Sequence, residues 1–124
     1  GDLGPSQMRG GLPLPRPKGR LASRGMNRTE AAYAQCLEVQ RVGGRIRWWT
    51  FEPFRLTLAA RTSYCPDFLV MDADGYLALH EVKGFLRDDA AVKLKVVAAL
   101  FPFPVFLVRK QGTGWQLTEI GTRE

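Results

Sequence analysis

The stretch CPDFLVMDADGYLALHEVKG, residues 65–84, decides the fold that the sequence predicts. It contains two short apolar runs, Phe68–Met71 and Leu77–Val82, each with the length and residue types of a β-strand. The segment between them, Asp72–Tyr76, holds two aspartates and a glycine, which tolerate the backbone angles of a chain reversal. The stretch therefore predicts an antiparallel β-hairpin.

Three polar residues lie at the open end of this hairpin. Asp67 precedes the first strand, Glu81 lies near the end of the second strand, and Lys83 follows it. Side chains alternate between the two faces of a strand, and directly opposite residues share a face. If the whole turn segment forms the loop, Met71 faces Leu77, and Asp67 then faces Glu81. We expect this register, or a bulge that restores it, because a two-residue Asp-Gly turn would scatter the three side chains.

Two adjacent carboxylates repel each other unless a cation lies between them. Carboxylate oxygens suit Mg²⁺ or Mn²⁺, which keep bound waters and accept a phosphate oxygen as a further ligand. A lysine beside such an ion can hold a phosphate oxygen or help to orient an attacking water. The group therefore indicates metal-assisted phosphodiester hydrolysis, although its spacing alone fits a surface hairpin with solvated charges equally well.

The spacing of these residues resembles the signature of the PD-(D/E)XK nuclease superfamily: Pro66-Asp67 and, fourteen residues on, Glu81-Val82-Lys83. Three further segments resemble small phage and prophage proteins assigned to that superfamily: residues 27–30, 48–54 and 82–85. The similarity extends over residues 26–108, roughly. It implies a restriction-endonuclease-like core, and we treat fold and function as separate predictions.

The resemblance implies a DNA endonuclease that uses Mg²⁺, for which Mn²⁺ substitutes. Asp67 and Glu81 would hold the ion, with the Glu30 carboxylate and the Val82 carbonyl as further ligands. Lys83 would stabilise the developing negative charge or orient the attacking water. Asp67, Glu81 and Lys83 are thus the candidate catalytic residues.

Small phage members of the superfamily include resolvases of branched DNA such as Holliday junctions. Because such enzymes cut two strands symmetrically, the resemblance favours a homodimer. It also implies a phage or prophage protein that acts in the cytoplasm of a bacterial host. Two alternatives remain: a nickase or restriction-like nuclease on duplex DNA or RNA, and a non-catalytic DNA-binding module that keeps the fold.

Five basic residues are candidates for contacts with the DNA backbone: Arg55, Arg61, Arg87, Lys93 and Lys95. Exposed basic residues without such a role fit the pattern as well. The histidine His80 lies on the strand face opposite Glu81, so we expect it to pack or hydrogen-bond rather than act as a general base. Trp48 and Trp49 point to opposite faces, and we expect at least one of them in the core.

Charge divides the chain of 124 residues into two parts. Of the net charge of +6, residues 1–25 carry +4, from five basic residues and one acidic residue, and residues 26–124 carry +2. We expect residues 1–25 to be a flexible basic arm rich in Pro and Gly, in part a remnant of an expression tag, and residues 26–124 to be one nuclease-like domain. No apolar run approaches the roughly 20 residues that span a membrane. Cys36 and Cys65 are expected to stay reduced.

The remaining pattern predicts an α/β fold, a small mixed β-sheet with flanking helices in the order α-β-β-β-α-β-β. A first helix should cover Arg28–Arg41, with Asn27 and Glu30 forming a capping box. A strand with a break at Pro53 should follow over residues 45–58. A second helix should begin near Arg87, capped by Asp88 or Asp89, and bury a stripe made of Val92, Val96, Ala99 and Leu100. Strands at residues 105–108 (central) and 115–120 (edge) complete the sheet, and the second helix lets residues 77–82 and 105–108 pair in parallel.

Overall fold

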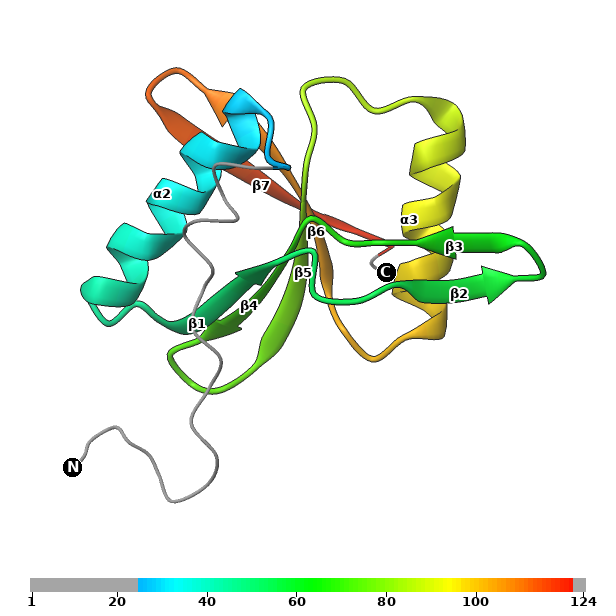
Figure 1. The fold of residues 1–124 in the computed structure, drawn as a ribbon, viewed down its shortest axis with the longest axis horizontal. Coiled ribbons are helices and arrows are strands. Elements are labelled where there is room, and N and C mark those ends of the chain that lie inside the picture. Colours follow the sequence, from blue (N-terminus) through cyan, green and yellow to red (C-terminus); the bar gives the residue numbers. More distant parts are fainter. Residues whose placement is uncertain (1–24, 122–124) are drawn as a thin grey trace.

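The computed structural model describes residues 25–121, and the predicted N-terminal arm lies almost entirely outside them. Two helices and seven strands follow one another in the order α2 (Arg28–Val42), β1 (Ile46–Phe51), β2 (Leu56–Ala59), β3 (Thr62–Tyr64), β4 (Phe68–Asp72), β5 (Leu77–Val82), α3 (Asp88–Leu100), β6 (Val105–Gln111) and β7 (Gly114–Ile120). Figure 1 shows these elements along the described part of the chain. The predicted α/β class, a small mixed sheet with flanking helices, is confirmed.

The main sheet has the strand order β1-β4-β5-β6-β7. β5 and β6 run parallel because α3 carries the chain from one end of the sheet to the other, and the remaining neighbours run antiparallel. This parallel pair is the one predicted from the helix between them. β6 lies between two neighbours and β7 lies at an edge, also as predicted.

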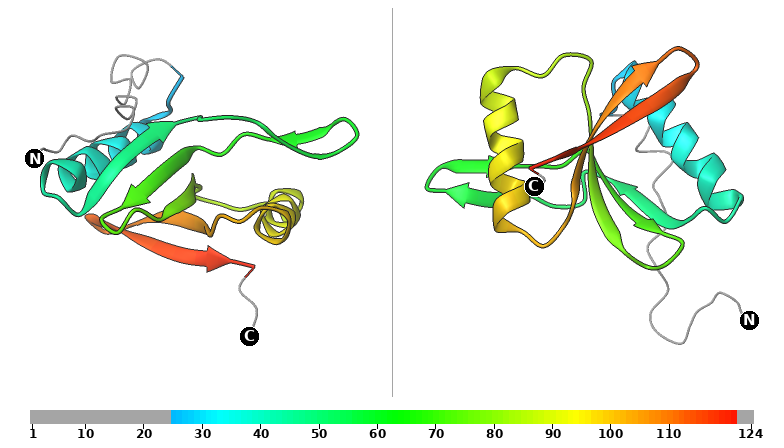
Figure 2. Two further views of the ribbon diagram at one scale, coloured as in Figure 1. Left: turned by 90° about the horizontal axis from the view of Figure 1, so that it is seen from below. Right: turned by 180° about the vertical axis from the view of Figure 1, so that it is seen from behind.

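The long strand predicted over residues 45–58 is interrupted, as the proline at position 53 indicated. β1 ends at Phe51, Glu52 adopts a left-handed backbone conformation with φ of 49°, and the chain resumes as β2. β2 pairs only with β3, which the sequence did not predict, and the two form a separate two-stranded sheet. This β2–β3 hairpin lies beside α3 in the views of Figures 1 and 2, and the described chain therefore has two strands more than the predicted order.

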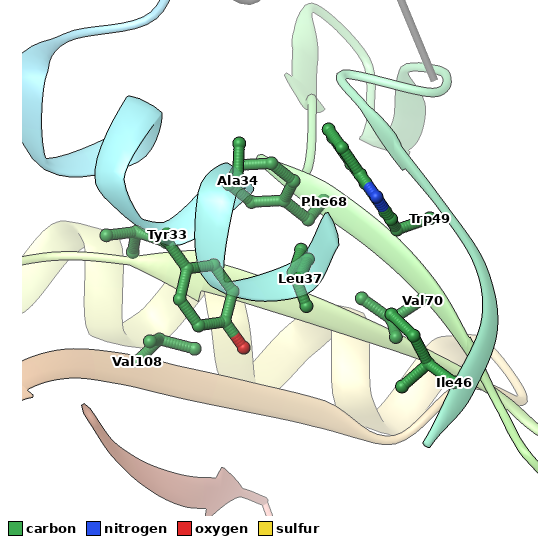
Figure 3. Close-up of a cluster of buried hydrophobic side chains, with 9 residues drawn as sticks. Tyr33, Ala34, Leu37, Ile46, Trp49, Phe68, Val70 and Val108 are labelled. Atoms are coloured by element: carbon green, nitrogen blue, oxygen red, sulfur yellow. The ribbon is translucent and has the colours of Figure 1, made fainter. Parts of the chain in front are cut away.

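Each helix covers its own face of the main sheet, because successive strand residues point to opposite sides. α2 packs on the face that carries Phe68 and Val70, and Figure 3 shows its inward residues Tyr33, Ala34 and Leu37 above that face. α3 and the β2–β3 hairpin pack on the other face, which carries the leucines at positions 69, 79 and 107. The molecule therefore has two apolar cores separated by the sheet.

The two tryptophans of β1 divide between these cores, as their opposite orientation predicted. Trp49 is buried in the α2 core and donates a hydrogen bond to Glu38 at 2.9 Å. Trp48 is half-buried and packs against the α3 core. Within residues 25–121, neither helix is long and apolar enough to cross a membrane.

The capping box at the start of α2 is confirmed. The Glu30 N–H donates to Asn27 Oδ1 at 2.7 Å, and the Asn27 N–H donates to a Glu30 carboxylate oxygen at 3.0 Å. The reciprocal bonds satisfy two backbone donors that have no partner inside the helix.

Two predictions for the second helix are wrong. Its N-cap is Arg87, which makes no capping bond through its side chain, and the two aspartates predicted as caps lie in the first turn. The helix buries Leu94 and Val97 instead of the predicted stripe, whose Val92 and Leu100 are 59% and 58% exposed. Apolar residues lie on both sides of this helix, and the sheet covers the side that carries Leu94 and Val97.

His80 is a buried core residue, as predicted from its position on the strand. Its Nδ1 lies 2.6 Å from the Tyr33 hydroxyl oxygen, and Phe106 packs edge-on against its ring. Burial lowers the pKa of His80 to about 4, so the ring is neutral near neutral pH. The imidazole joins α2 to the sheet on the face opposite Glu81.

Candidate active site

The hairpin formed by β4 and β5 has the register that brings the predicted catalytic residues together. Met71 faces Leu77, and the pairing continues in step to Phe68 opposite His80. The turn closes when the Asp72 N–H donates to the Tyr76 carbonyl at 2.8 Å, and Gly75 supplies the positive φ of 94° that the turn needs. The predicted register of the longer loop is therefore confirmed, and the two-residue Asp-Gly turn does not form.

Backbone hydrogen bonds fix the two carboxylates at the open end of this hairpin. The Asp67 N–H donates to Glu81 Oε1 at 3.4 Å, and the Val82 N–H donates to Asp67 Oδ2 at 2.9 Å. Lys83 completes the group, because its Nζ lies 3.3 Å from Glu81 Oε2. The structure thus places Asp67, Glu81 and Lys83 together, as the sequence predicted.

Both carboxyl groups are buried, which changes their acidity. Asp67 is 8% exposed and Glu81 is 5% exposed. Burial, and then the negative charge of Glu81, raise the pKa of Asp67 to about 7. Burial also raises the pKa of Glu81, against the effects of its hydrogen bonds from Tyr64 and Lys83. Burial and mutual repulsion therefore favour the neutral form of each carboxyl group, and a bound cation would favour the ionised form.

Tyr64 is a member of the site that sequence reasoning missed. It ends β3, is buried in the α3 core, and donates its hydroxyl hydrogen to Glu81 Oε1. Burial and the charge of Glu81 raise the pKa of the Tyr64 hydroxyl, so that it remains a donor. Tyr64 and Glu81 lie 17 residues apart in sequence. The sequence signal for Tyr64 was an aromatic residue three positions before Asp67, the predicted metal ligand.

Glu30 and Val82, the two further metal ligands predicted, take part in other contacts in the structure. Glu30 is engaged with Asn27 at the start of α2, and its charge reaches Asp67, whose pKa it helps to raise. Val82 contributes its N–H to Asp67 and pairs with Val108 of β6. Their roles as metal ligands stay predictions.

The donor set fits a hard divalent cation. Asp67 Oδ1 accepts no hydrogen bond from residues 25–121. Glu81 Oε1 accepts from the Tyr64 hydroxyl and the Asp67 N–H, and Glu81 Oε2 pairs with Lys83. When ionised, the two carboxylates exceed the charge of Lys83 by one negative unit. In the same range no group of three or more His, Cys, Asp or Glu side chains is arranged to hold a metal. Mg²⁺ commonly uses one or two carboxylates and completes its shell with water and phosphate oxygens, so two carboxylates suit it.

Two of the five basic residues predicted to contact DNA meet beside this site. Arg55 precedes β2 and donates from Nη1 to Ser63 Oγ at 3.1 Å. Lys93 of α3 donates from Nζ to the Ser63 carbonyl at 3.0 Å. The other three are exposed at separate positions: Arg61 in the turn between β2 and β3, Arg87 before α3 and Lys95 on α3. Contacts of all five with DNA stay predictions.

The two cysteines are free, as expected. Cys65 lies two residues before Asp67, and burial raises the pKa of its thiol. Its side chain has a long contact with the Pro66 carbonyl at 3.7 Å, so it is a packing residue at the edge of the site.

Comparison of the chain with protein-family models, with curated proteins and with solved structures gives no match. The resemblance to the PD-(D/E)XK superfamily therefore rests on the residues quoted above, and the site is interpreted from its own geometry.

Proposed function

We propose that the protein is a divalent-metal-dependent endonuclease that hydrolyses DNA phosphodiester bonds. The observation that carries the proposal is the convergence of Asp67, Glu81 and Lys83 at the open end of one hairpin. A merely structural role would not explain two buried carboxylates placed beside each other, because their mutual repulsion and burial oppose folding when they are ionised. A site that binds a cation and then a phosphate uses both features.

The chain's own residues divide the work. Asp67 and Glu81 would hold the ion, and the backbone bonds from Val82 and Asp67 fix their orientation. When bound, Mg²⁺ supplies positive charge that polarises a phosphodiester and acidifies water. Lys83, half-exposed and paired with Glu81, has donors left for a phosphate oxygen and would stabilise the charge that develops there. Tyr64 would keep Glu81 oriented toward the ion.

The finer identity of the substrate comes from the resemblance. It implies products with a 5′-phosphate and a 3′-hydroxyl, a branched DNA substrate of the Holliday-junction type, and a homodimer that cuts two strands symmetrically. It also places the activity in the cytoplasm of a bacterial host. The proposal in its specific form is therefore a homodimeric nuclease that cuts branched DNA.

A cleavage assay tests the proposal. Wild-type protein, Asp67→Asn and Lys83→Gln are incubated with a four-way junction and with a linear duplex of the same sequence, in Mg²⁺ and in EDTA. Asparagine retains an oxygen that can accept the Val82 N–H, so Asp67→Asn removes charge with little change of shape. Asp74→Asn is the matched control, because this exposed aspartate lies in the turn at the far end of the hairpin.

We expect wild type and Asp74→Asn to cleave DNA in Mg²⁺. We expect no cleavage in EDTA and none by Asp67→Asn or Lys83→Gln. Preference for the junction supports the resolvase form, whereas equal cutting of the duplex supports a nickase or restriction-like enzyme. DNA binding without cleavage in Mg²⁺ or Mn²⁺, unchanged by Asp67→Asn, would identify a DNA-binding module and contradict the proposal.

A further inference from the structure

The β2–β3 hairpin and α3 meet at Ser63, where two cations converge. Arg55 approaches the Ser63 hydroxyl from the start of the hairpin, and Lys93 approaches the Ser63 carbonyl from α3. The two basic residues are far apart in sequence, and only the packing of the hairpin against the helix brings them to one residue. Figure 2 shows this hairpin beside α3 from two further directions.

Neither cation is neutralised by a carboxylate in the described chain. Among residues 25–121 the ion pairs join Arg41 to Glu38, Lys83 to Glu81, and Arg87 to Asp89. Arg55 and Lys93 are both exposed and use one donor each on Ser63. An arginine has five N–H donors and a lysine has three, so most of their donors remain free for an anion. A phosphate matches this arrangement, because it accepts several charge-assisted hydrogen bonds at once.

The two cations are also held in a fixed relation to the candidate active site. Ser63 is followed directly by Tyr64, whose hydroxyl donates to Glu81. The residue that both cations contact is therefore the chain neighbour of the residue that hydrogen-bonds the Glu81 carboxylate. A nucleic acid strand cut at the carboxylates would pass another of its phosphates close to Ser63.

We propose that Arg55 and Lys93 form a second phosphate site at the junction of the β2–β3 hairpin and α3, which binds a backbone phosphate next to the bond that is cut. This inference rests on the proposed function, which identifies the bound phosphate as part of a DNA substrate. Binding of the anionic phosphate to Arg55 and Lys93 itself needs no metal. The hairpin, which is a separate sheet and contributes Tyr64 to the first site, thus has a substrate-binding role. Contacts to one strand predict that single-stranded DNA occupies the site as readily as duplex DNA.

Binding in EDTA tests this inference independently of cleavage. The affinities of a short labelled single strand and of the matching duplex are measured by fluorescence anisotropy over a range of KCl concentrations. Each phosphate contact contributes about 0.7 to the slope of log K against log salt for a single strand and about 0.9 for a duplex. Arg55→Ala and Lys93→Ala should each reduce the slope by about this amount, with several-fold weaker binding at low salt, and the double variant should lose both.

The matched control is Arg47→Ala. Arg47 is exposed and carries the same charge. It lies beside the Gly75 turn of the β4–β5 hairpin, at the end opposite Asp67. Its removal should leave the salt slope unchanged. Arg55→Lys and Lys93→Arg keep the charge and should retain most of the slope, which separates phosphate binding from a purely structural role in holding the hairpin to α3. Melting temperatures show whether each variant is folded.

The possible results are distinct. A reduced slope for Arg55→Ala and Lys93→Ala, with the control unchanged, supports the second phosphate site even if no cleavage is found. Loss of slope for both the single strand and the duplex supports contacts to one strand, and loss for the duplex alone would overturn the inference in this form. An unchanged slope in folded Arg55→Ala and Lys93→Ala proteins, or an equal loss in Arg47→Ala, would overturn the inference even if the protein cleaves DNA.

Discussion

Asp67→Asn should make the metal-free protein more stable above neutral pH. Burial and the charge of Glu81 raise the pKa of Asp67 to about 7 in the folded protein, whereas an aspartate in the unfolded chain has a pKa near 3.9. Between these values the folded state binds a proton that the unfolded state releases. Stability from this group is therefore complete at low pH and is lost as the pH rises toward 7. Asparagine carries no charge, and it avoids this loss.

The size of the effect follows from the two pKa values. Each pH unit in the window between them changes the unfolding free energy by about 1.4 kcal/mol. The window spans roughly three units, from the ordinary value of 3.8 to about 7. Asp67→Asn should therefore gain about 2 to 4 kcal/mol on the wild type by pH 8, and should be nearly equal to it near pH 4.

A second buried group, His80, also makes the stability depend on pH. The quantity to measure is therefore the difference in unfolding free energy between Asp67→Asn and the wild type. Burial lowers the pKa of His80 to about 4, so His80 stabilises the folded state as the pH rises through the range below 6.5. This effect opposes that of Asp67 in the wild type and makes the wild-type curve flatter. It is common to both proteins, because His80 lies on the other face of the sheet, and it cancels in the difference.

Urea unfolding in EDTA, followed by tryptophan fluorescence, gives the free energy of unfolding at several pH values from 4 to 8. Asp74→Asn, the exposed control at the turn, should follow the wild type throughout. A difference between Asp67→Asn and wild type that does not change with pH would refute the reasoning. So would an Asp67→Asn protein that is less stable than wild type at pH 8.

Two further substitutions test individual hydrogen bonds. Tyr33→Phe leaves buried His80 Nδ1 without its partner and should lower the unfolding free energy by about 1 to 3 kcal/mol. Chemical denaturation compares this variant with Tyr76→Phe, a substitution at an exposed tyrosine that should change the unfolding free energy little. Equal losses in the two variants would contradict the account. Tyr64→Phe removes the hydroxyl that orients Glu81 and should weaken Mn²⁺ binding by about 10-fold or more; a Mn²⁺ titration with an unchanged midpoint would show that the hydroxyl has no such role.

The central hairpin could be predicted from sequence because its information is local. Alternation fixed which side chains share a face, and the choice of the longer loop set Asp67 opposite Glu81. Both depend on residues within twenty positions of each other. The structure has this register, with Met71 facing Leu77.

The side of α3 that faces the sheet could not be predicted, for a physical reason. Leu94 and Val97 lie on one side of the helix, and Val92 and Leu100 lie on the other, so the apolar period is present twice. Only the shape of the sheet and of the β2–β3 hairpin decides between them. Periodicity alone gave the wrong side.

Tyr64 and the meeting of Arg55 with Lys93 were out of reach for a related reason. β3 has three residues, too few for a clear alternating pattern. The contact of this hairpin with α3 joins residues 30 positions apart in sequence, and its contact with Glu81 joins two different sheets. Such contacts depend on how the hairpin folds back over the sheet, which no local pattern specifies.

Metal binding tests the central claim most directly. Isothermal titration of the wild-type protein with Mn²⁺ and Mg²⁺ at pH 8 should show saturable binding. Asp67→Asn and Glu81→Gln should abolish it, and Asp74→Asn should retain it. A wild-type protein that binds neither ion in this titration, or an Asp67→Asn protein that binds as tightly as wild type, would contradict the assignment of Asp67 and Glu81 as the ligands of a catalytic cation.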